Sequence, residues 1–237
     1  MATTGSATGP VALLPLPRRF ELVFDAEPEL GQLTGAARRV LAVAAALFFE
    51  QGSAATSVRE LTRACGLSPG ALYNHFGSRD ELLFTLVRTG HVRAQRDLDA
   101  ALATGPGTAH EQLIGFVRAY TEIHLRFPPF AQLIHREYVH LSPARKAEII
   151  RRRRRMRDQL VAILQAGVAE ASFALVGGAN SEVGSAMMVL DMCSRTSEWF
   201  NPAQPSAAFT ERYAIAALRL VGARERSPAR AASRRPR

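Results

Sequence analysis

The chain has 237 residues, 47% of them apolar and 22% charged, with a formal net charge of +9. This length and apolar content allow two modest helical domains that share an interface, and abundant alanine favours helices over strands. No stretch approaches the roughly 20 apolar residues of a membrane span, and Cys65 and Cys193 lie far apart in sequence. We therefore exclude a membrane protein and a disulfide scaffold, and expect a reduced, cytoplasmic protein.

The positive charge is concentrated at the C-terminal end. Residues 224–237 hold six arginines and one glutamate, a surplus of +5, whereas residues 34–83 hold five arginines and four acidic residues, a surplus of only +1. We expect residues 223–237 to form a disordered basic tail that adds a salt-dependent, sequence-independent attraction to DNA.

Residues 1–33 are predicted to form a flexible N-terminal arm. Their first part mixes Gly, Thr, Ala and Pro, which is typical of disorder, and residues 11–17 are too few and too rich in proline for a signal peptide. Phe20 and Phe24 can pack locally. Arg18 and Arg19 can reach a DNA minor groove, as homeodomain arms do, or remain solvated.

Residues 34–51 are predicted to form the first helix of a small core, and Gly52 to end it. The apolar stripe of this helix consists of Val40, Leu41, Ala44, Leu47 and Phe48. We expect the stripe to pack against apolar residues of the next two helices, namely Val58, Leu61, Leu67, Leu72 and Phe76.

The stretch from residue 56 to residue 83 carries three signals for the start of a helix. Each is a serine that can cap the helix, and two of them are followed three residues later by a glutamate that completes a capping box. The three are Ser57, Ser68 and Ser78. Gly66 can adopt the left-handed conformation that ends a helix. The spacing predicts helices over residues 57–65 and 69–75 in a helix-turn-helix, whose second helix fits a DNA major groove.

From residue 34 to residue 86 the chain resembles the DNA-binding domain of the TetR/AcrR family of bacterial transcriptional regulators. The matching stretches read RVLAVAAALFFEQG and TSVRELTRACGLSPGALYNHFGSRDELL. Ser53 departs from the family, which usually has an aromatic residue there. The resemblance implies an all-α chain of about nine helices, with a helix-turn-helix DNA-binding domain at residues 34–83 and an effector-binding and dimerisation domain at residues 84–222.

The resemblance and the side-chain chemistry together predict which residues contact DNA. Tyr73, His75 and Arg79 resemble family positions that bind phosphates, and such contacts set the register. Arg59 matches a position that can reach a base edge, and Asn74 can pair with adenine. The full predicted set is Thr56, Ser57, Arg59, Ser68, Pro69, Gly70, Ala71, Tyr73, Asn74, His75 and Arg79.

The remaining helices follow the same periodicity. A long helix is predicted from residue 78 to about residue 103, and because it is the only covalent connection between the two domains, we expect an effector signal to pass through it. Further helices are expected at about residues 108–126, 129–141, 142–171, 179–200 and 206–221.

The last two predicted helices are the expected dimer interface. Residues 179–200 are apolar on nearly every side of a helical wheel, which indicates burial against both the same chain and a partner subunit. As in the family, a homodimer would place two recognition helices about 34–36 Å apart on a palindromic operator in double-stranded DNA.

The C-terminal part resembles a subgroup of TetR-like repressors that control fatty-acid or sterol-side-chain catabolism and respond to acyl-CoA thioesters. The stretches that carry this resemblance are residues 133–173, 187–202 and 209–221. It implies a small hydrophobic effector, for example an acyl-CoA. The alternatives are a drug-responsive repressor of an efflux pump and a ligand-independent architectural DNA-binding protein.

Five consecutive arginines, at residues 151–155, give a separate argument about the effector. On a helix, Arg153 falls roughly 40° and Arg152 roughly 60° from the apolar stripe that begins at Ile149. Both therefore border a buried surface, where an unpaired charge is costly. A carboxylate such as Glu137, extension of the side chains to water, or an anionic ligand would each satisfy them.

The expected effector-binding residues are aromatic, apolar and arginine side chains, although the same spacing also fits a plain core. They are Phe116, Tyr120, His124, Phe127, Phe130, Ile134, Tyr138, Arg152, Arg153, Met187, Asp191 and Trp199. No metal site is expected, because His135, Glu137 and His140 fall on different faces of a helix. Residues 104–237 carry no catalytic constellation, so we expect neither an enzyme nor a cofactor.

Overall fold

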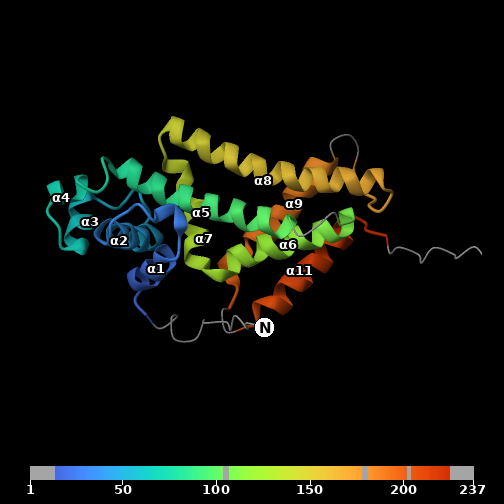
Figure 1. Ribbon diagram of the computed structural model, residues 1–237, viewed down its shortest axis with the longest axis horizontal. Coiled ribbons are helices and arrows are strands. Elements are labelled where there is room, and N and C mark those ends of the chain that lie inside the picture. The colour runs from blue at the N-terminus through green and yellow to red at the C-terminus, as the bar shows by residue number, and fades with distance from the viewer. Residues whose placement is uncertain (1–13, 104–106, 178–180, 202–203, 225–237) are drawn as a thin grey trace, which may run out of the picture.

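The computed structural model describes residues 14–103, 107–177, 181–201 and 204–224, and every regular element within these ranges is helical (Figure 1). The α-helices are α1 (Leu16–Asp25), α2 (Gly35–Gln51), α3 (Val58–Cys65), α4 (Pro69–Tyr73), α5 (Arg79–Leu102), α6 (Ala109–Arg126), α7 (Pro128–Glu137), α8 (Pro143–Ala169), α9 (Ser181–Ser194), α10 (Thr196–Trp199) and α11 (Ser206–Leu220). Two 3-10 helices lie between α-helices: Pro28–Leu30 between α1 and α2, and Tyr138–His140 between α7 and α8. The all-α prediction is confirmed.

The helix starts lie where the capping residues indicated. The hydroxyls of Ser57, Ser68 and Ser78 each accept a hydrogen bond from the backbone N–H three residues further on. Gly66 ends α3 with a φ of 66°, in the left-handed region. The result is the predicted helix-turn-helix, in which α4 follows α3 after a tight turn and both lie at one end of the molecule (Figure 1).

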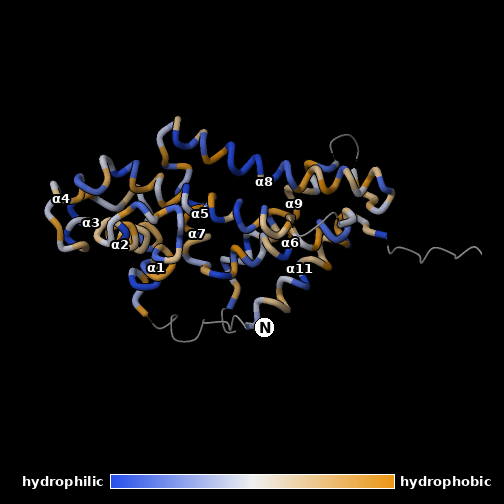
Figure 2. The backbone as a smooth tube through the Cα atoms, in the orientation of Figure 1, coloured by the Kyte–Doolittle hydropathy of each residue, from blue (hydrophilic) through white to orange (hydrophobic). Residues whose placement is uncertain are grey.

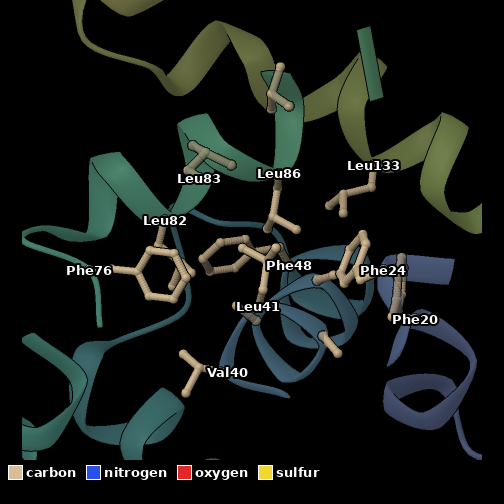
Figure 3. Packing of buried hydrophobic residues seen from close by; sticks show 14 of the residues in the cluster. Phe20, Phe24, Val40, Leu41, Phe48, Phe76, Leu82, Leu83, Leu86 and Leu133 are labelled. Carbon is tan, nitrogen blue, oxygen red and sulfur yellow. The ribbon is translucent and has the colours of Figure 1, made fainter. Parts of the chain in front are cut away.

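The N-terminal segment differs from its prediction as a flexible arm. Residues 1–13 lie outside the described ranges, but residues 16–25 form α1, and Phe20 and Phe24 are completely buried against α2 (Figure 3). The two rings are spaced four residues apart, so they occupy one face of the helix. Arg18 pairs with Glu21, and the guanidinium of Arg19 lies 5.2 Å from the centre of the Phe127 ring. Both arginines therefore belong to a packed helix.

Buried apolar residues form two clusters that meet along α5. The first joins α1, α2 and the helix-turn-helix to Leu82, Leu83 and Leu86 of α5 and to Leu133 of α7 (Figure 3). The second fills the space between the C-terminal half of α5 and helices α6, α8, α9 and α11. Because α7 contributes to the first cluster, the helix-turn-helix end and the C-terminal part share a packed interface as well as the covalent connection through α5.

The predicted helix over residues 179–200 is interrupted at Arg195, and its C-terminal part forms the separate helix α10. Side-chain hydroxyls compete with the helical hydrogen bonds at this point. Thr196 Oγ1 donates to the carbonyl of Cys193 (2.7 Å), and Ser197 Oγ donates to that of Ser194 (3.0 Å). None of the helices in the described part of the chain is both long and apolar enough to cross a bilayer.

Candidate DNA-binding surface and effector cavity

The exposed face of the helix-turn-helix carries most of the residues expected to contact DNA. Tyr73 is 49% exposed although it is aromatic, while Leu72 and Phe76 on the opposite face of the turn are buried. The other exposed members of the predicted set are Ser57, Arg59, Ser68, Gly70 and Asn74, and Ala71 and His75 are half-buried. Pro69, also in the predicted set, is the first residue of α4.

Two predicted DNA contacts lie in less accessible places. Thr56 is only 3% exposed, and its hydroxyl donates to the carbonyl of Gly52 (2.9 Å), so its side chain is occupied within the fold. Arg79 is half-buried, with its guanidinium 5.9 Å from the centre of the Phe48 ring. Its Nε and Nη2 atoms are buried without a hydrogen-bond partner, which leaves Nη1 to reach a phosphate.

A cavity of about 280 Å³ lies between α5, α6, α7, α8 and α9. Nine of the twelve residues expected to bind an effector line it, namely Tyr120, His124, Phe127, Phe130, Ile134, Tyr138, Arg153, Met187 and Asp191. Gly90 of α5 also belongs to the wall. A Cβ atom there would lie 2.6 Å from Cδ1 and 3.2 Å from Cγ2 of Ile134, so a larger residue at this position would displace the Ile134 side chain.

Three expected effector residues lie elsewhere. Phe116 is fully buried in the core, where its ring stacks on that of Tyr120, and Trp199 is 58% exposed on the surface. Arg152 forms an ion pair with Glu148 one turn earlier in α8 (2.9 Å). The helical wheel placed Arg152 at the border of the apolar stripe, and a local carboxylate satisfies it there.

Three histidines from three helices line the cavity, and only His124 was among the residues expected to bind an effector. His124 Nδ1 lies 2.7 Å from the carbonyl oxygen of Tyr120, and a carbonyl oxygen only accepts, so Nδ1 carries the proton. Since burial lowers the pKa of His124 to about 4, its Nε2 is a bare acceptor. His135 Nε2 must therefore donate to it (2.9 Å), and His135 Nδ1 accepts from Nη1 of Arg153 (3.0 Å).

The third histidine, His91 in α5, is 2% exposed. Its Nδ1 lies 2.8 Å from the carbonyl oxygen of Val87 and donates to it. Burial lowers the pKa of His91 to about 4 and that of His135 well below its usual value, so both rings are neutral at physiological pH. A histidine among the apolar positions that α5 buries was the sequence signal that could have identified this residue.

The charged groups around the cavity are mainly arginines, and the run at residues 151–155 gives α8 a hydrophilic stretch (Figure 2). Arg93 pairs with Glu27 (2.6 Å), and Arg126 pairs with Asp97 (3.1 Å). Among the described residues, Arg153 has no carboxylate partner, and its guanidinium lies 4.9 Å from the centre of the Tyr138 ring. The cavity thus presents a cation that no side chain neutralises.

Glu137 was proposed from the sequence as a partner for Arg152 or Arg153. Its carboxylate instead binds Ser53 and Arg136. It is 1% exposed and accepts hydrogen bonds from the backbone N–H of Ser53 (2.9 Å) and from Arg136 Nε (2.7 Å). Although burial alone raises the pKa of Glu137, these hydrogen bonds outweigh it and lower the pKa below its usual value. Arg136 Nη2 also donates to the carbonyls of Phe48 (2.6 Å) and Phe49 (2.8 Å).

These contacts attach the end of α7 to the end of α2, and we call Arg136 and Glu137 the α7 latch. A second attachment joins α5 to α8. Asp80 accepts hydrogen bonds from the backbone N–H (3.0 Å) and hydroxyl (2.8 Å) of Ser142, and pairs with Arg145 (2.9 Å). Cavity walls and the DNA-binding end are therefore connected by specific polar contacts. Within the described ranges no group of His, Cys, Asp and Glu is arranged to hold a metal ion.

Five exposed apolar side chains belong to α9, α10 and α11, and we call them the apolar patch. They are Val183 (40% exposed), Met187 (43%), Met188 (50%), Trp199 (58%) and Ile215 (42%). Patches of this kind on a folded chain mark interaction surfaces. The helices that carry the patch are the two predicted to form the dimer interface, with the C-terminal part of the first now separated as α10.

Comparison with known proteins identifies the relatives of this chain. A family model described as bacterial regulatory proteins of the tetR family matches residues 40–86, and one described as a tetracyclin repressor-like C-terminal domain matches residues 106–221. The transcriptional repressor KstR2 of Mycolicibacterium smegmatis is 33% identical over 142 residues, which cover 56% of this chain and 65% of the relative. The chain spans between 29% and 65% of the length of three mycobacterial KstR2 repressors that it matches.

Solved structures give the same picture. The TetR family transcriptional regulator PfmR from Thermus thermophilus is 32% identical, with a TM-score of 0.66 over 76% of this chain and 97% of that chain. AibR in complex with isovaleryl coenzyme A and operator DNA is 21% identical, with a TM-score of 0.67 over 80% of this chain and 100% of that chain, a likeness of fold. The matched families and relatives are transcriptional regulators and not enzymes.

Proposed function

The chain belongs to the TetR family of bacterial regulatory proteins, and we propose that it is a ligand-responsive repressor that binds a palindromic operator as a homodimer. A small apolar effector with an anionic group, such as an acyl-CoA, releases it from DNA. The observation that carries this proposal is the combination of the exposed face of the helix-turn-helix, which we call the reading face, and a partly open, cationic cavity, which α5 and the α7 latch join.

The reading face supports the DNA-binding part of the proposal. Asn74 and Arg59 are exposed side chains that can reach base edges, while Tyr73 and Nη1 of Arg79 contact phosphates. At the start of α4, Pro69 has no N–H and the N–H groups of Ala71 and Leu72 donate to Ser68, so the backbone N–H of Gly70 is the one that suits a phosphate oxygen. One face of this size reads a few base pairs, so operator specificity requires a second copy.

The apolar patch on α9, α10 and α11 supports dimerisation. Met188 and Ile215 are each more than two-fifths exposed in the single chain, and burying them against the same patch of a second copy would remove apolar surface from water. A two-fold axis through this patch forms an interface that is its own complement, as closed homodimers require. The two reading faces then meet successive turns of one face of the DNA.

The effector class follows from the cavity. Its volume of about 280 Å³ is near the lower limit of small-molecule sites, so it holds an acyl group and not a whole coenzyme A. Arg153 supplies an uncompensated positive charge inside, and Arg154 and Arg157 line the cavity on the same helix. An acyl chain inside with its carboxylate or phosphates on these arginines satisfies both features. A cationic drug does not suit this charge.

Release from DNA follows if the effector displaces α7. The helix carries cavity residues Phe130 and Ile134 and, three residues further on, the latch residue Glu137. A ligand that separates α7 from α5 therefore loosens the contact with Ser53 at the end of α2 and changes the spacing of the two reading faces. Differential affinity of a few kcal/mol for the two arrangements is sufficient for such coupling.

The proposal is tested in two steps: the operator is selected first, and release of the protein from that operator by small molecules is then measured. Random duplexes are selected with the full chain, and the chosen operator is titrated by fluorescence anisotropy with medium- and long-chain acyl-CoAs and with cationic lipophiles. We expect a palindrome bound by two copies and release by the acyl-CoAs. A chain that stays monomeric and selects no palindrome contradicts the proposal. Release by cationic lipophiles alone supports an efflux-pump repressor, and binding that no small molecule relieves supports an architectural protein.

A further inference from the structure

The α5 wall of the cavity carries His91, whose ring nitrogen Nε2 can only accept a hydrogen bond. Because Nδ1 of His91 donates to the carbonyl of Val87 in the preceding turn of α5 (2.8 Å), the ring cannot rotate to use that nitrogen elsewhere. The ring is neutral, so Nε2 has a lone pair and no proton. His91 is 2% exposed and lines the cavity, which makes Nε2 a pure acceptor beside the ligand space.

No side chain of the described residues donates to this lone pair. The ring of His135 is the nearest histidine, with 6.5 Å between ring centres, and its Nε2–H already donates to His124. Arg153 donates to the other nitrogen of His135. These contacts occupy the Nε2–H of His135 and one N–H of Arg153, and no hydrogen bond within the described residues reaches Nε2 of His91, an acceptor that a donor would stabilise. The natural source of the missing donor is a molecule in the cavity.

We propose that the effector carries a hydroxyl group on its apolar body, and that this hydroxyl donates a hydrogen bond to Nε2 of His91 while Arg153 binds the anionic group. This inference rests on the proposed function and makes the effector class narrower. An ammonium group is also a donor, but Arg93, Arg126 and Arg153 surround this space and Asp191 is the sole carboxylate among the described lining residues. A neutral hydroxyl donor meets no such repulsion.

The test compares ligands that differ only at the hydroxyl. Decanoic acid and its 3-, 6- and 10-hydroxy derivatives are titrated against the full chain by calorimetry, both as free acids and as coenzyme A thioesters, so that the source of the anion is also determined. We expect one hydroxyl position to bind about tenfold more tightly than the unsubstituted acid, as one hydrogen bond to a buried acceptor allows. Its methyl ether, which accepts but cannot donate, must lose this gain.

The variant His91→Leu removes the acceptor and keeps an apolar side chain. It is expected to bind hydroxylated and unsubstituted ligands equally, whereas Arg153→Gln weakens both and keeps their ratio. If His91→Leu does not fold, the ¹⁵N signal of Nε2 in the unmodified protein decides instead. It must shift with the hydroxylated ligand and not with the methyl ether.

The possible failures are distinguishable. If the acids and thioesters release the operator but the hydroxyl gives no gain, or the gain persists in His91→Leu, the hydroxyl inference is wrong and the proposed function stands. If none of the acids or thioesters binds the protein or releases the operator, the proposed effector class is wrong, and the hydroxyl inference falls with it.

Discussion

The α7 latch gives the most quantitative prediction, through the variant Glu137→Gln. The carboxylate accepts from the Ser53 backbone N–H (2.9 Å) and from Arg136 Nε (2.7 Å) at a site that is 1% exposed. Glutamine keeps one acceptor oxygen and turns an NH₂ group towards the second donor. The variant thus loses a charge-assisted hydrogen bond and leaves a donor unsatisfied, which costs about 2–3 kcal/mol of unfolding free energy. For a chain of this size the melting temperature should fall by roughly 4–12 °C.

Stability is measured by urea unfolding followed by circular dichroism, with Glu198→Gln as the matched control. Glu198 pairs with Arg195 at the surface, where the two side chains are 55% and 71% exposed, so its loss should be worth less than about 0.5 kcal/mol. In operator titrations, Glu137→Gln should also reduce the factor by which the effector weakens DNA binding. The reasoning is refuted if both variants lose the same stability, or if Glu137→Gln keeps the full effector response.

Three further predictions follow from the cavity and the apolar patch. Gly90→Ala should lose about 1–3 kcal/mol of stability and weaken effector binding, because its Cβ would lie 2.6 Å from Cδ1 of Ile134; urea unfolding and calorimetry measure the two effects. His91 and His124 have folded pKa values of about 4 and titrate near 6.5 when unfolded, so stability is complete above about pH 6.5 and falls as the pH drops towards 4. Each histidine should cost on the order of 1 kcal/mol of unfolding free energy by pH 5.5, which unfolding experiments across this pH range measure. Met188→Glu should shift the homodimer towards monomer in sedimentation velocity without lowering helix content, since the side chain is 50% exposed in the single chain.

Each of these predictions has a control within the chain. Gly115→Ala, whose Cβ would meet an ordinary contact at 3.9 Å, should be neutral or slightly stabilising. The variant His91→Leu should lose part of the pH dependence below 6.5, and an unchanged profile would contradict the assignment. Val176→Glu, at a residue 83% exposed outside the apolar patch, should leave the dimer intact.

Short-range signals explain what the sequence predicted well. The capping serines Ser57, Ser68 and Ser78 and the left-handed Gly66 act within four residues of themselves, so the helix-turn-helix followed from local chemistry. The helix α1 was missed because the mixture of Gly, Thr, Ala and Pro in the N-terminal stretch suggested a flexible arm. Proline is tolerated in the first turn of a helix, where its missing N–H has no partner to lose.

The cavity was predictable in part, because its lining residues come from separate helices. Helical spacing identified nine of the lining residues, but not which way a polar side chain turns. Glu137 turned towards Ser53 and not towards the arginines of α8, and His91, His124 and His135 meet only once α5, α6 and α7 pack together. A pairing between distant helices depends on tertiary packing that no local pattern contains.

The central claim is that effector binding in the cavity and DNA binding at the reading face are thermodynamically coupled. Calorimetry tests this claim directly. The affinity of the most effective acyl-CoA is measured for the free homodimer and for the homodimer bound to its selected operator. Thermodynamic linkage requires that the operator weaken effector binding by the same factor as the effector weakens operator binding, and we predict a factor of at least about five. Equal effector affinities with and without operator would contradict the account.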